Sequence, residues 1–500
     1  MVKQQGHPKG LIFLFLTEMW ERFSFYGISG ILVLYLTKAL NVSAADASLI
    51  SGAYMAFTFL APILGGWVAD KLIGYTWSVI IGGIIIFAGN IILALPTGIK
   101  GVYLGLATVA IGTGFLKSTV SVLVGQLYTK NDNRRDSAYT IFYMGINLGS
   151  ILAGLIISYV AEMINWHYAF VLIAIGMGFG LAIFITGYKK GVYSETSNIV
   201  NQANLKRKIL LFNGAIWLII GTIFCITLIF ILLSSPGNTK IVITAISIGM
   251  LLYIALLAFR CDTKEERNQV LSILIFIITA VFFWSLYKQM FNSMALFIDK
   301  DINRSFMGKV IPTGMFVLVP NSIFIILLAS VFAKIWMVLE NKGKNPSSPT
   351  KFLIGLLFTL ASFSVLSFGA YVAQSSGQAS SMFWPIFGIF LLTCAELCIS
   401  PVGLSIVSKM APEKFAAFLM GSWFLASSIG SYVSGLLSSL VTLPKGEITV
   451  AISSEAYFNL FSKCSIGMAI MITVYTIFLP LIKKLTGDKL PHQIKEDIEH

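Results

Sequence analysis

Apolar runs separated by short polar breaks recur along the whole chain of 500 residues. Gly82–Leu95, Ile209–Leu233 and Ile241–Phe259 are examples, and several runs reach the roughly 20 residues that a helix needs to cross a bilayer. Because backbone polar groups in hydrocarbon must be satisfied within their own segment, such runs predict α-helices. The alternating stretches of about 10 residues that are typical of a membrane β-barrel are not found. The pattern therefore predicts an all-α polytopic membrane protein.

The apolar runs predict fourteen membrane spans. Six form a first bundle, two very apolar spans form an inserted hairpin after a polar linker, and six form a second bundle. The predicted spans are 11–37, 46–70, 76–95, 101–128, 138–161, 166–187, 209–233, 238–259, 269–298, 311–339, 351–374, 382–410, 414–441 and 457–485. The corresponding division of the chain is 1–187 for the first bundle, 188–268 for the cytoplasmic linker and hairpin, 269–490 for the second bundle and 491–500 for a cytoplasmic tail.

Composition and charge support a membrane protein. Hydrophobic residues make up 57% of the chain and charged residues 11%, whereas about a quarter of the residues of a soluble domain are charged. The net charge of +13 is spread over many loops, so it does not form the basic stripe of a nucleic-acid binder. With the N-terminus placed inside, 24 Lys and Arg residues lie on the inner side and 8 on the outer side. This excess predicts that both termini are cytoplasmic.

The sequence shows no pattern for a metal, a nucleotide or a catalytic nucleophile. The five cysteines lie mostly in apolar segments without a Cys-x-x-Cys pair, and the four histidines are scattered. No Walker-type loop, Gly-x-Ser-x-Gly or His-Glu-x-x-His motif is found. A sensor would need a soluble output domain, and the longest polar stretches are loops and a short tail. We therefore expect a transporter without a cofactor, driven by a proton gradient, and not an enzyme.

Ionisable residues inside predicted spans are the strongest functional signal. Each costs about 2.5–3.5 kcal/mol on insertion scales, so such residues usually face the protein interior and serve function. There are at least six such residues: Glu18, Glu21, Arg22, Lys117, Lys288 and Glu396.

Glu18, Glu21 and Arg22 are spaced i, i+3 and i+4, so they share one helix face. They predict a titratable relay that couples protons to substrate, with a purely structural ion cluster as the alternative. Lys117 follows two glycines well inside its span, which favours a cavity over snorkelling. With Glu396 in the other half of the chain, the cations Arg22 and Lys117 predict that a zwitterionic solute is held in a shared chamber near the membrane midplane.

Four ordered motifs give the chain a resemblance, along almost its whole length, to the proton-coupled oligopeptide transporter family of the major facilitator superfamily. The motifs are EMWERFSFYG at 18–27, GGWVADKLIG at 65–74, FYMGINLG at 142–149 and ELCISPVGLS at 396–405. The first resembles the family's E-x-x-E-R signature and the third its F-Y-x-x-I-N-x-G signature. The resemblance implies two six-helix bundles, with the inserted pair as the peripheral hairpin of bacterial members.

The resemblance also implies roles for individual residues. Proton coupling is assigned to Glu18, Glu21, Arg22 and Lys117. Substrate binding is assigned to Arg22, Tyr26, Lys117, Tyr143, Asn147, Lys288, Asn321, Glu396, Ser400 and Trp423. Within this set the peptide amino terminus would meet Asn147 and Glu396, and its carboxylate would meet Arg22 and Lys117. Trp423 has packing as its alternative role.

Three positions depart from the family pattern. Ser29 stands where peptide-transporting members usually carry a second arginine, and Lys288 stands where they usually carry an acid. Those two positions pair across the outer gate in the family, and a change of both avoids leaving one buried charge unpaired. We hypothesise that Lys288 takes over a gating or carboxylate-binding task. Phe59 also replaces a frequent tyrosine.

The resulting prediction is a proton-coupled symporter that imports di- and tripeptides by alternating access. The alternative is a transporter of the same fold for another small solute, such as an anion or an amino-acid derivative. Expected partners are a small peptide or zwitterion, protons and the lipid bilayer, without nucleic acid. We expect a monomer in the bacterial cytoplasmic (inner) membrane.

Overall fold

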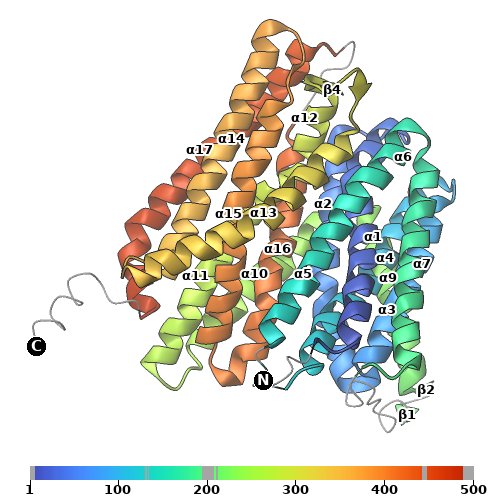
Figure 1. Cartoon of the computed structure of the whole chain (residues 1–500), viewed down its shortest axis with the longest axis vertical. Coiled ribbons are helices and arrows are strands. Elements are labelled where there is room, and N and C mark those ends of the chain that lie inside the picture. The colour runs from blue at the N-terminus through green and yellow to red at the C-terminus, as the bar shows by residue number, and fades with distance from the viewer. Residues whose placement is uncertain are drawn as a thin grey trace, which may run out of the picture. The chain divides into compact units, whose positions relative to one another are not determined.

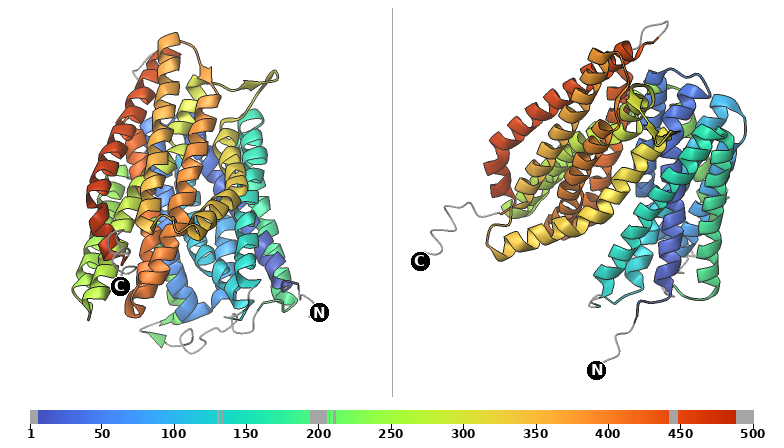
Figure 2. Two further views of the ribbon diagram at one scale, coloured as in Figure 1. Left: turned by 60° about the vertical axis from the view of Figure 1, so that its left-hand side comes forward. Right: turned by 45° about the horizontal axis from the view of Figure 1, so that its top comes forward.

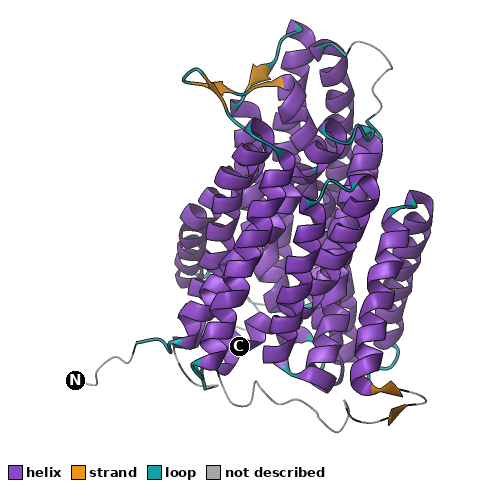
Figure 3. Ribbon diagram, turned by 90° about the vertical axis from the view of Figure 1, so that its right-hand side faces the viewer, coloured by secondary structure: helices purple, strands orange, loops and turns teal. Residues whose placement is uncertain are grey.

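The computed structural model describes residues 6–129, 132, 134–193, 206, 208–209, 212–441 and 448–487. Almost all of this described chain is helical, and the few strands are two-residue pieces in connecting segments (Figure 3). Twelve of the described helical segments are long and apolar enough to cross a membrane. Two further long helices, α1 and α16, bring the number of spans in the described part to fourteen. α1 differs because its central charges lower its hydropathy.

The helices follow the predicted order along the chain (Figure 1). Those before the linker are α1 (Gly10–Lys38), α2 (Ala44–Val68), α3 (Tyr75–Ala94), α4 (Gly98–Gln126), α5 (Arg134–Leu152), α6 (Ser158–Met163) and α7 (Trp166–Lys189). The inserted pair is α9 (Gly214–Leu233) and α10 (Pro236–Ala258). Those that follow are α11 (Lys264–Tyr287), α12 (Ser293–Asp301), α13 (Thr313–Asn341), α14 (Ser348–Ser376), α15 (Phe383–Met410), α16 (Ala416–Ser439) and α17 (Val450–Leu485).

Most predicted span ends lie within a few residues of the observed ends, and three starts differ by five residues or more because of local capping. The span expected from residue 269 begins at Lys264, behind a Thr263 cap. The span expected from residue 209 begins at Gly214, since β1 (Lys208–Ile209) pairs antiparallel with β2 (Phe212–Asn213). The Asn213 side chain then accepts a hydrogen bond from the Ile216 backbone N–H at 3.0 Å, as an N-cap does. The last span was predicted from residue 457, but α17 begins at Val450 behind a Thr449 cap.

The chain divides into two compact units. The first comprises Met1–Ser43, Ala53–Thr239 and Ile311–Ser322, and the second comprises Ala44–Gly52, Lys240–Val310 and Ile323–His500. In the first unit α3 packs along α4 and α7, and α9 packs on α4. In the second unit α14 and α17 run side by side (Figures 1 and 2). The four-part division expected from sequence stays a prediction, and its tail, 491–500, lies outside the described residues.

Three interruptions break the regular helices of the membrane spans. η1 (Ala69–Ile73) and η2 (Ala153–Ile157) are π-helical turns that continue α2 and join α5 to α6. η4 (Lys288–Phe291) is a 3₁₀ turn between α11 and α12. Such turns redirect side chains and are frequent at functional sites. η4 contains Lys288, and η1 lies within the 65–74 motif.

Glycines allow the closest helix contacts within each unit. A Cβ added at Gly65 of α2 would lie 2.1 Å from the Gly114 carbonyl oxygen of α4. In the second unit, a Cβ at Gly52 would lie 2.8 Å from the Gly435 Cα of α16. Small residues are the usual means of bringing helix backbones together in membranes, where packing rather than hydrophobic burial drives association.

Replacing Gly65 by alanine should destabilise the protein. The new methyl group has no space beside the Gly114 backbone, and overpacking of this kind typically costs about 1–3 kcal/mol. We expect a lower Tm in detergent, followed by circular dichroism. Gly249→Ala in α10 is the matched control, because a Cβ there meets nothing within 4 Å. Equal Tm values for the two variants would contradict the close α2–α4 contact.

Candidate functional site

The three charges of α1 form one buried ion cluster. Arg22 Nε lies 3.2 Å from Glu18 Oε1, and the Arg22 guanidinium also donates a hydrogen bond to the Glu21 carboxylate. All three residues are at most 4% exposed. The i, i+3 and i+4 spacing thus places one cation between two carboxylates, as predicted from the sequence. Two negative charges against one positive charge leave the triad with an excess of negative charge when all three groups are ionised.

Neighbouring helices fix this face of α1. The Asn90 amide of α3 donates a hydrogen bond to the Ser24 hydroxyl of α1 at 2.8 Å. A Cβ added at Gly149 of α5 would lie 2.3 Å from the Met19 carbonyl oxygen, so α5 can approach α1 only through glycine. Glu18 Oε2 is buried and accepts no hydrogen bond from the residues that the structure describes. That oxygen is therefore available to a proton.

Lys117 of α4 belongs to the same group of charges. Its Nζ lies 3.9 Å from the centroid of the Phe59 ring of α2, and the lysine acts electrostatically on Glu18. The Phe59 ring in turn lies edge-on to Phe25, with 6.2 Å between centroids, and Phe25 lies beneath the Arg22 guanidinium at 5.0 Å. Two cations thus rest on two aromatic rings, which stabilise positive charge through the negative face of the ring.

The remaining predicted site residues of the first unit differ in exposure. Tyr26 is half-buried next to Phe25, and Tyr143 of α5 is 45% exposed. Asn147 is buried, and its amide donates to the Tyr143 carbonyl oxygen at 3.2 Å, one turn earlier in α5. Asn321 follows Pro320 inside α13 and is also buried. Exposure thus makes the Tyr143 side chain the most accessible of these four.

In the second unit, Lys288 lies among aromatic rings. Its Nζ is 5.4 Å from the Trp284 ring centroid, 5.5 Å from that of Tyr287 and 5.5 Å from that of Phe291, and the residue is 5% exposed. The negative faces of aromatic rings at these distances attract an ammonium group. The 3₁₀ turn is what brings Tyr287 and Phe291 around the same ammonium group.

A serine-rich stretch of α16 holds this turn in place. Gln289 donates to the Ser434 carbonyl oxygen at 3.0 Å and accepts from the Ser438 hydroxyl at 2.9 Å. Asn292 donates to the Ser434 hydroxyl at 3.0 Å. These positioning residues were missed in the sequence, where the available signal was two amide residues, Gln289 and Asn292, within the predicted span 269–298.

Glu396 and Ser400 lie one turn apart in the middle of α15, and both are half-buried. Trp423 of α16 is 3% exposed and packs on α15, where a Cβ added at Gly403 would lie 2.0 Å from its ring. Its ring centroid is also 6.3 Å from that of Phe352. Packing is therefore part of the role of Trp423, and its contact with substrate stays a prediction.

The structure thus brings together Glu18, Glu21, Arg22 and Lys117 in the first unit. It places Lys288, Glu396, Ser400 and Trp423 in the second unit. The functional roles assigned to all these residues stay predictions.

Comparisons with known proteins agree with this architecture. Residues 76–456 match the model of the POT family. The chain is 35% identical to peptide transporter YePEPT of Yersinia enterocolitica, over 97% of this chain and 96% of that protein. It is 32% identical to a di-/tripeptide transporter of Lactococcus lactis, over 97% of each chain. The crystal structure of a mutant peptide transporter POT in complex with alafosfalin aligns with a TM-score of 0.84, 31% identity and 97% of each chain covered. The predicted fold class, two six-helix bundles with an inserted hairpin, is confirmed.

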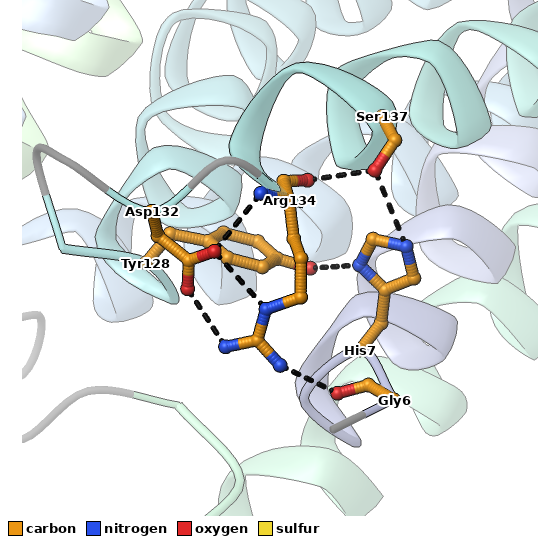
Figure 4. Close-up of polar contacts among 6 residues, drawn as sticks. All are labelled: Gly6, His7, Tyr128, Asp132, Arg134 and Ser137. Atoms are coloured by element: carbon orange, nitrogen blue, oxygen red, sulfur yellow. Dashed lines mark hydrogen bonds and ion pairs between the residues drawn. The ribbon is translucent and has the colours of Figure 1, made fainter. Parts of the chain in front are cut away.

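A separate polar cluster joins the segment before α1 to the ends of α4 and α5 (Figure 4). Arg134 makes a two-pronged contact with Asp132, with Nε–Oδ1 at 3.0 Å and Nη2–Oδ2 at 2.7 Å, and Arg134 Nη1 donates to the Gly6 carbonyl oxygen at 2.8 Å. His7 Nδ1 lies 2.8 Å from the Tyr128 hydroxyl. The hydrogen bonds from Arg134 lower the pKa of Asp132 to about 2.

The Asp132–Arg134 pair should contribute a constant stability between pH 5 and 8. Because folding lowers the pKa of Asp132 from its ordinary value of about 3.9, the contribution is present above that value and is lost as the pH falls towards 2. We expect the Tm difference between wild type and Asp132→Asn to stay constant over this range. Asp136→Asn, at an exposed position in the first turn of α5, is the control. A Tm difference that changes between pH 5 and 8 would contradict this assignment.

Proposed function

Because this chain belongs to the POT family, we propose that it is a proton-coupled symporter that imports di- and tripeptides by alternating access. The observation that carries the proposal is the buried cluster of Glu18, Glu21 and Arg22, which combines two proton acceptors with a cation that can bind a carboxylate. Relatives named as peptide and di-/tripeptide transporters support the substrate class.

Coupling follows from competition for Arg22. While Arg22 pairs with Glu18 and Glu21, both carboxylates are stabilised as anions. When the carboxylate of a peptide engages Arg22, the glutamates lose part of that stabilisation and take up a proton more readily. Release of the peptide on the inner side restores the ion pairs and expels the proton. A proton that crosses a potential of 100 mV supplies about 2.3 kcal/mol.

The two ends of the peptide are recognised by opposite charges in this proposal. Arg22 and Lys117 bind the carboxylate, while Asn147 and Glu396 bind the amino terminus. The accessible hydroxyl of Tyr143 is suited to hydrogen-bond the peptide backbone. Tyr26, Asn321 and Ser400 provide further polar contacts, and Trp423 borders a side-chain pocket.

A second candidate function is transport of another small solute by the same fold, such as an anion or an amino-acid derivative. It is favoured by Lys288, a buried cation among three rings, together with Ser29, which is 1% exposed. These residues change the charge at positions where the family usually has an acid and an arginine. A peptide library and a set of small anions, tested in proteoliposomes with an imposed proton gradient, distinguish the two candidates.

We also propose the membrane, the topology and the oligomeric state in which this protein works. The protein is a multi-pass protein of the bacterial cytoplasmic membrane with both termini in the cytoplasm, as the basic inner loops indicate. It works as a monomer, without a cofactor, and has no enzymatic activity.

Replacing Glu21 by glutamine should uncouple transport from protons. The variant keeps the shape of the side chain but removes one titratable group from the Arg22 cluster. In proteoliposomes, we expect gradient-driven accumulation of a dipeptide to fall at least about tenfold, while exchange of labelled for unlabelled dipeptide is retained. Glu413→Gln, at an exposed position outside the spans, is the control. Full accumulation by the Glu21 variant would argue against the coupling role.

Replacing Lys288 by alanine should weaken substrate binding. A hydrogen bond to a charged group contributes about 1.5–3 kcal/mol, which corresponds to roughly a 10- to 100-fold loss of affinity. Uptake kinetics at several pH values measure this loss, with Lys300→Ala at the exposed end of α12 as the control. Unchanged affinity together with an unchanged pH profile would remove any special role for Lys288.

A further inference from the structure

The second unit has a groove of about 370 Å³ between α11, α16 and α17. None of the residues that line it belongs to the proposed substrate site. Its walls are mostly apolar, with Phe282 on α11, Leu437 on α16 and Met468 on α17 as examples. Two polar side chains, Asn459 and Lys463, lie one turn apart on α17 at this groove, and both are exposed.

The position of Lys463 along α17 places it at the edge of the hydrocarbon. Cys464–Ile482 contains no charged residue, and Lys483 and Lys484 follow it directly. At a rise of 1.5 Å per residue, the 20 steps from Lys463 to Lys483 span about 30 Å, which is the thickness of a hydrocarbon core. The two lysines therefore mark its opposite boundaries, and Lys463 lies level with one layer of headgroups.

The groove continues from Lys463 towards the membrane centre. Gly467 and Met468, one turn further along α17, line it together with Val281 of α11 and Val433 of α16. A Cβ added at Gly467 would meet no heavy atom within 4 Å, so the glycine leaves this wall open. The Ser285 hydroxyl in the wall is already bonded to the Val281 carbonyl oxygen at 2.6 Å. The deeper part of the groove is thus apolar in character.

The charge and the shape of this groove together indicate which class of ligand it can bind. None of the ion pairs found among the described residues includes Lys463. Snorkelling would explain a lysine at this depth, but it does not explain an amide one turn away and an apolar groove directly below. A cation with a hydrogen-bond donor above an apolar channel matches a phosphate above an acyl chain, as in basic lipid pockets between helices.

We propose that this groove binds one anionic phospholipid. The phosphate group lies at the Lys463 ammonium and the Asn459 amide, and one acyl chain follows the groove past Gly467. The proposal is independent of the transported substrate, because it uses no residue of the ion cluster and none of the predicted peptide contacts.

Native mass spectrometry of the full chain in detergent tests the proposal. Phosphatidylglycerol and phosphatidylcholine with identical acyl chains are titrated separately, and the occupancy of the first bound lipid is compared. We expect phosphatidylglycerol to bind at least about fivefold more tightly to the wild type. Lys463→Gln should abolish this preference, whereas Lys463→Arg should retain it. Lys483→Gln, at the other boundary of the same helix, should leave the preference unchanged.

A second variant tests the acyl chain. Gly467→Leu fills the groove and should lower the occupancy of both lipids, whereas Gly249→Leu in α10, also beside open space, should not. A preference that survives Lys463→Gln overturns the proposal. So does the appearance of wild-type dimers that Gly467→Leu abolishes, because the groove would then be an interface with a second copy of the chain. If the leucine variant does not fold, the glutamine and arginine variants at 463 still decide the question.

Discussion

The energetic cost of burying Arg22, Glu18 and Glu21 in a membrane helix governs the structure of the first unit. An isolated charge at this depth is costly, so each member of the cluster depends on the other two for compensation. Lys117 adds a second positive charge to balance the two carboxylates, and the Phe25 and Phe59 rings support both cations. The glycine contact of α5 and the Asn90–Ser24 hydrogen bond hold the helices that enclose them. Because these buried charges are stable only when they balance one another, a bound carboxylate or a proton can change which of them are paired.

The second unit compensates the energetic cost of its buried charge in a different way. Its buried cation, Lys288, is surrounded by the faces of aromatic rings. The amides of Gln289 and Asn292, in and next to the turn that carries Lys288, donate hydrogen bonds to Ser434 of α16. The negative faces of these rings stabilise the positive charge of the ammonium group. Arg22 of the first unit is instead paired with the carboxylates of Glu18 and Glu21.

The sequence predicted the spans and the α1 cluster because both depend on local pattern: hydrophobic length and the i, i+3, i+4 spacing. It could not predict the rings around Lys288 as a group, since the 3₁₀ turn that gathers Tyr287 and Phe291 is fastened by Ser434, about 145 positions away in the chain. The late start of α9 was missed because a pair of two-residue strands precedes the Asn213 cap. The groove at Lys463 likewise depends on three helices distant in sequence, and the sequence analysis did not single out this lysine, which lies within the predicted span 457–485.

The packing of Trp423 against Gly403 has an evolutionary consequence. The indole occupies the volume that any larger residue at position 403 would need. The ring can lie there only because glycine has no side chain. Substitution at 403 would displace the indole of Trp423, which is proposed to border the side-chain pocket, without changing the identity of that residue. Selection for a broader or narrower range of cargo could therefore act through Gly403, a position within the 396–405 motif that has no side chain of its own.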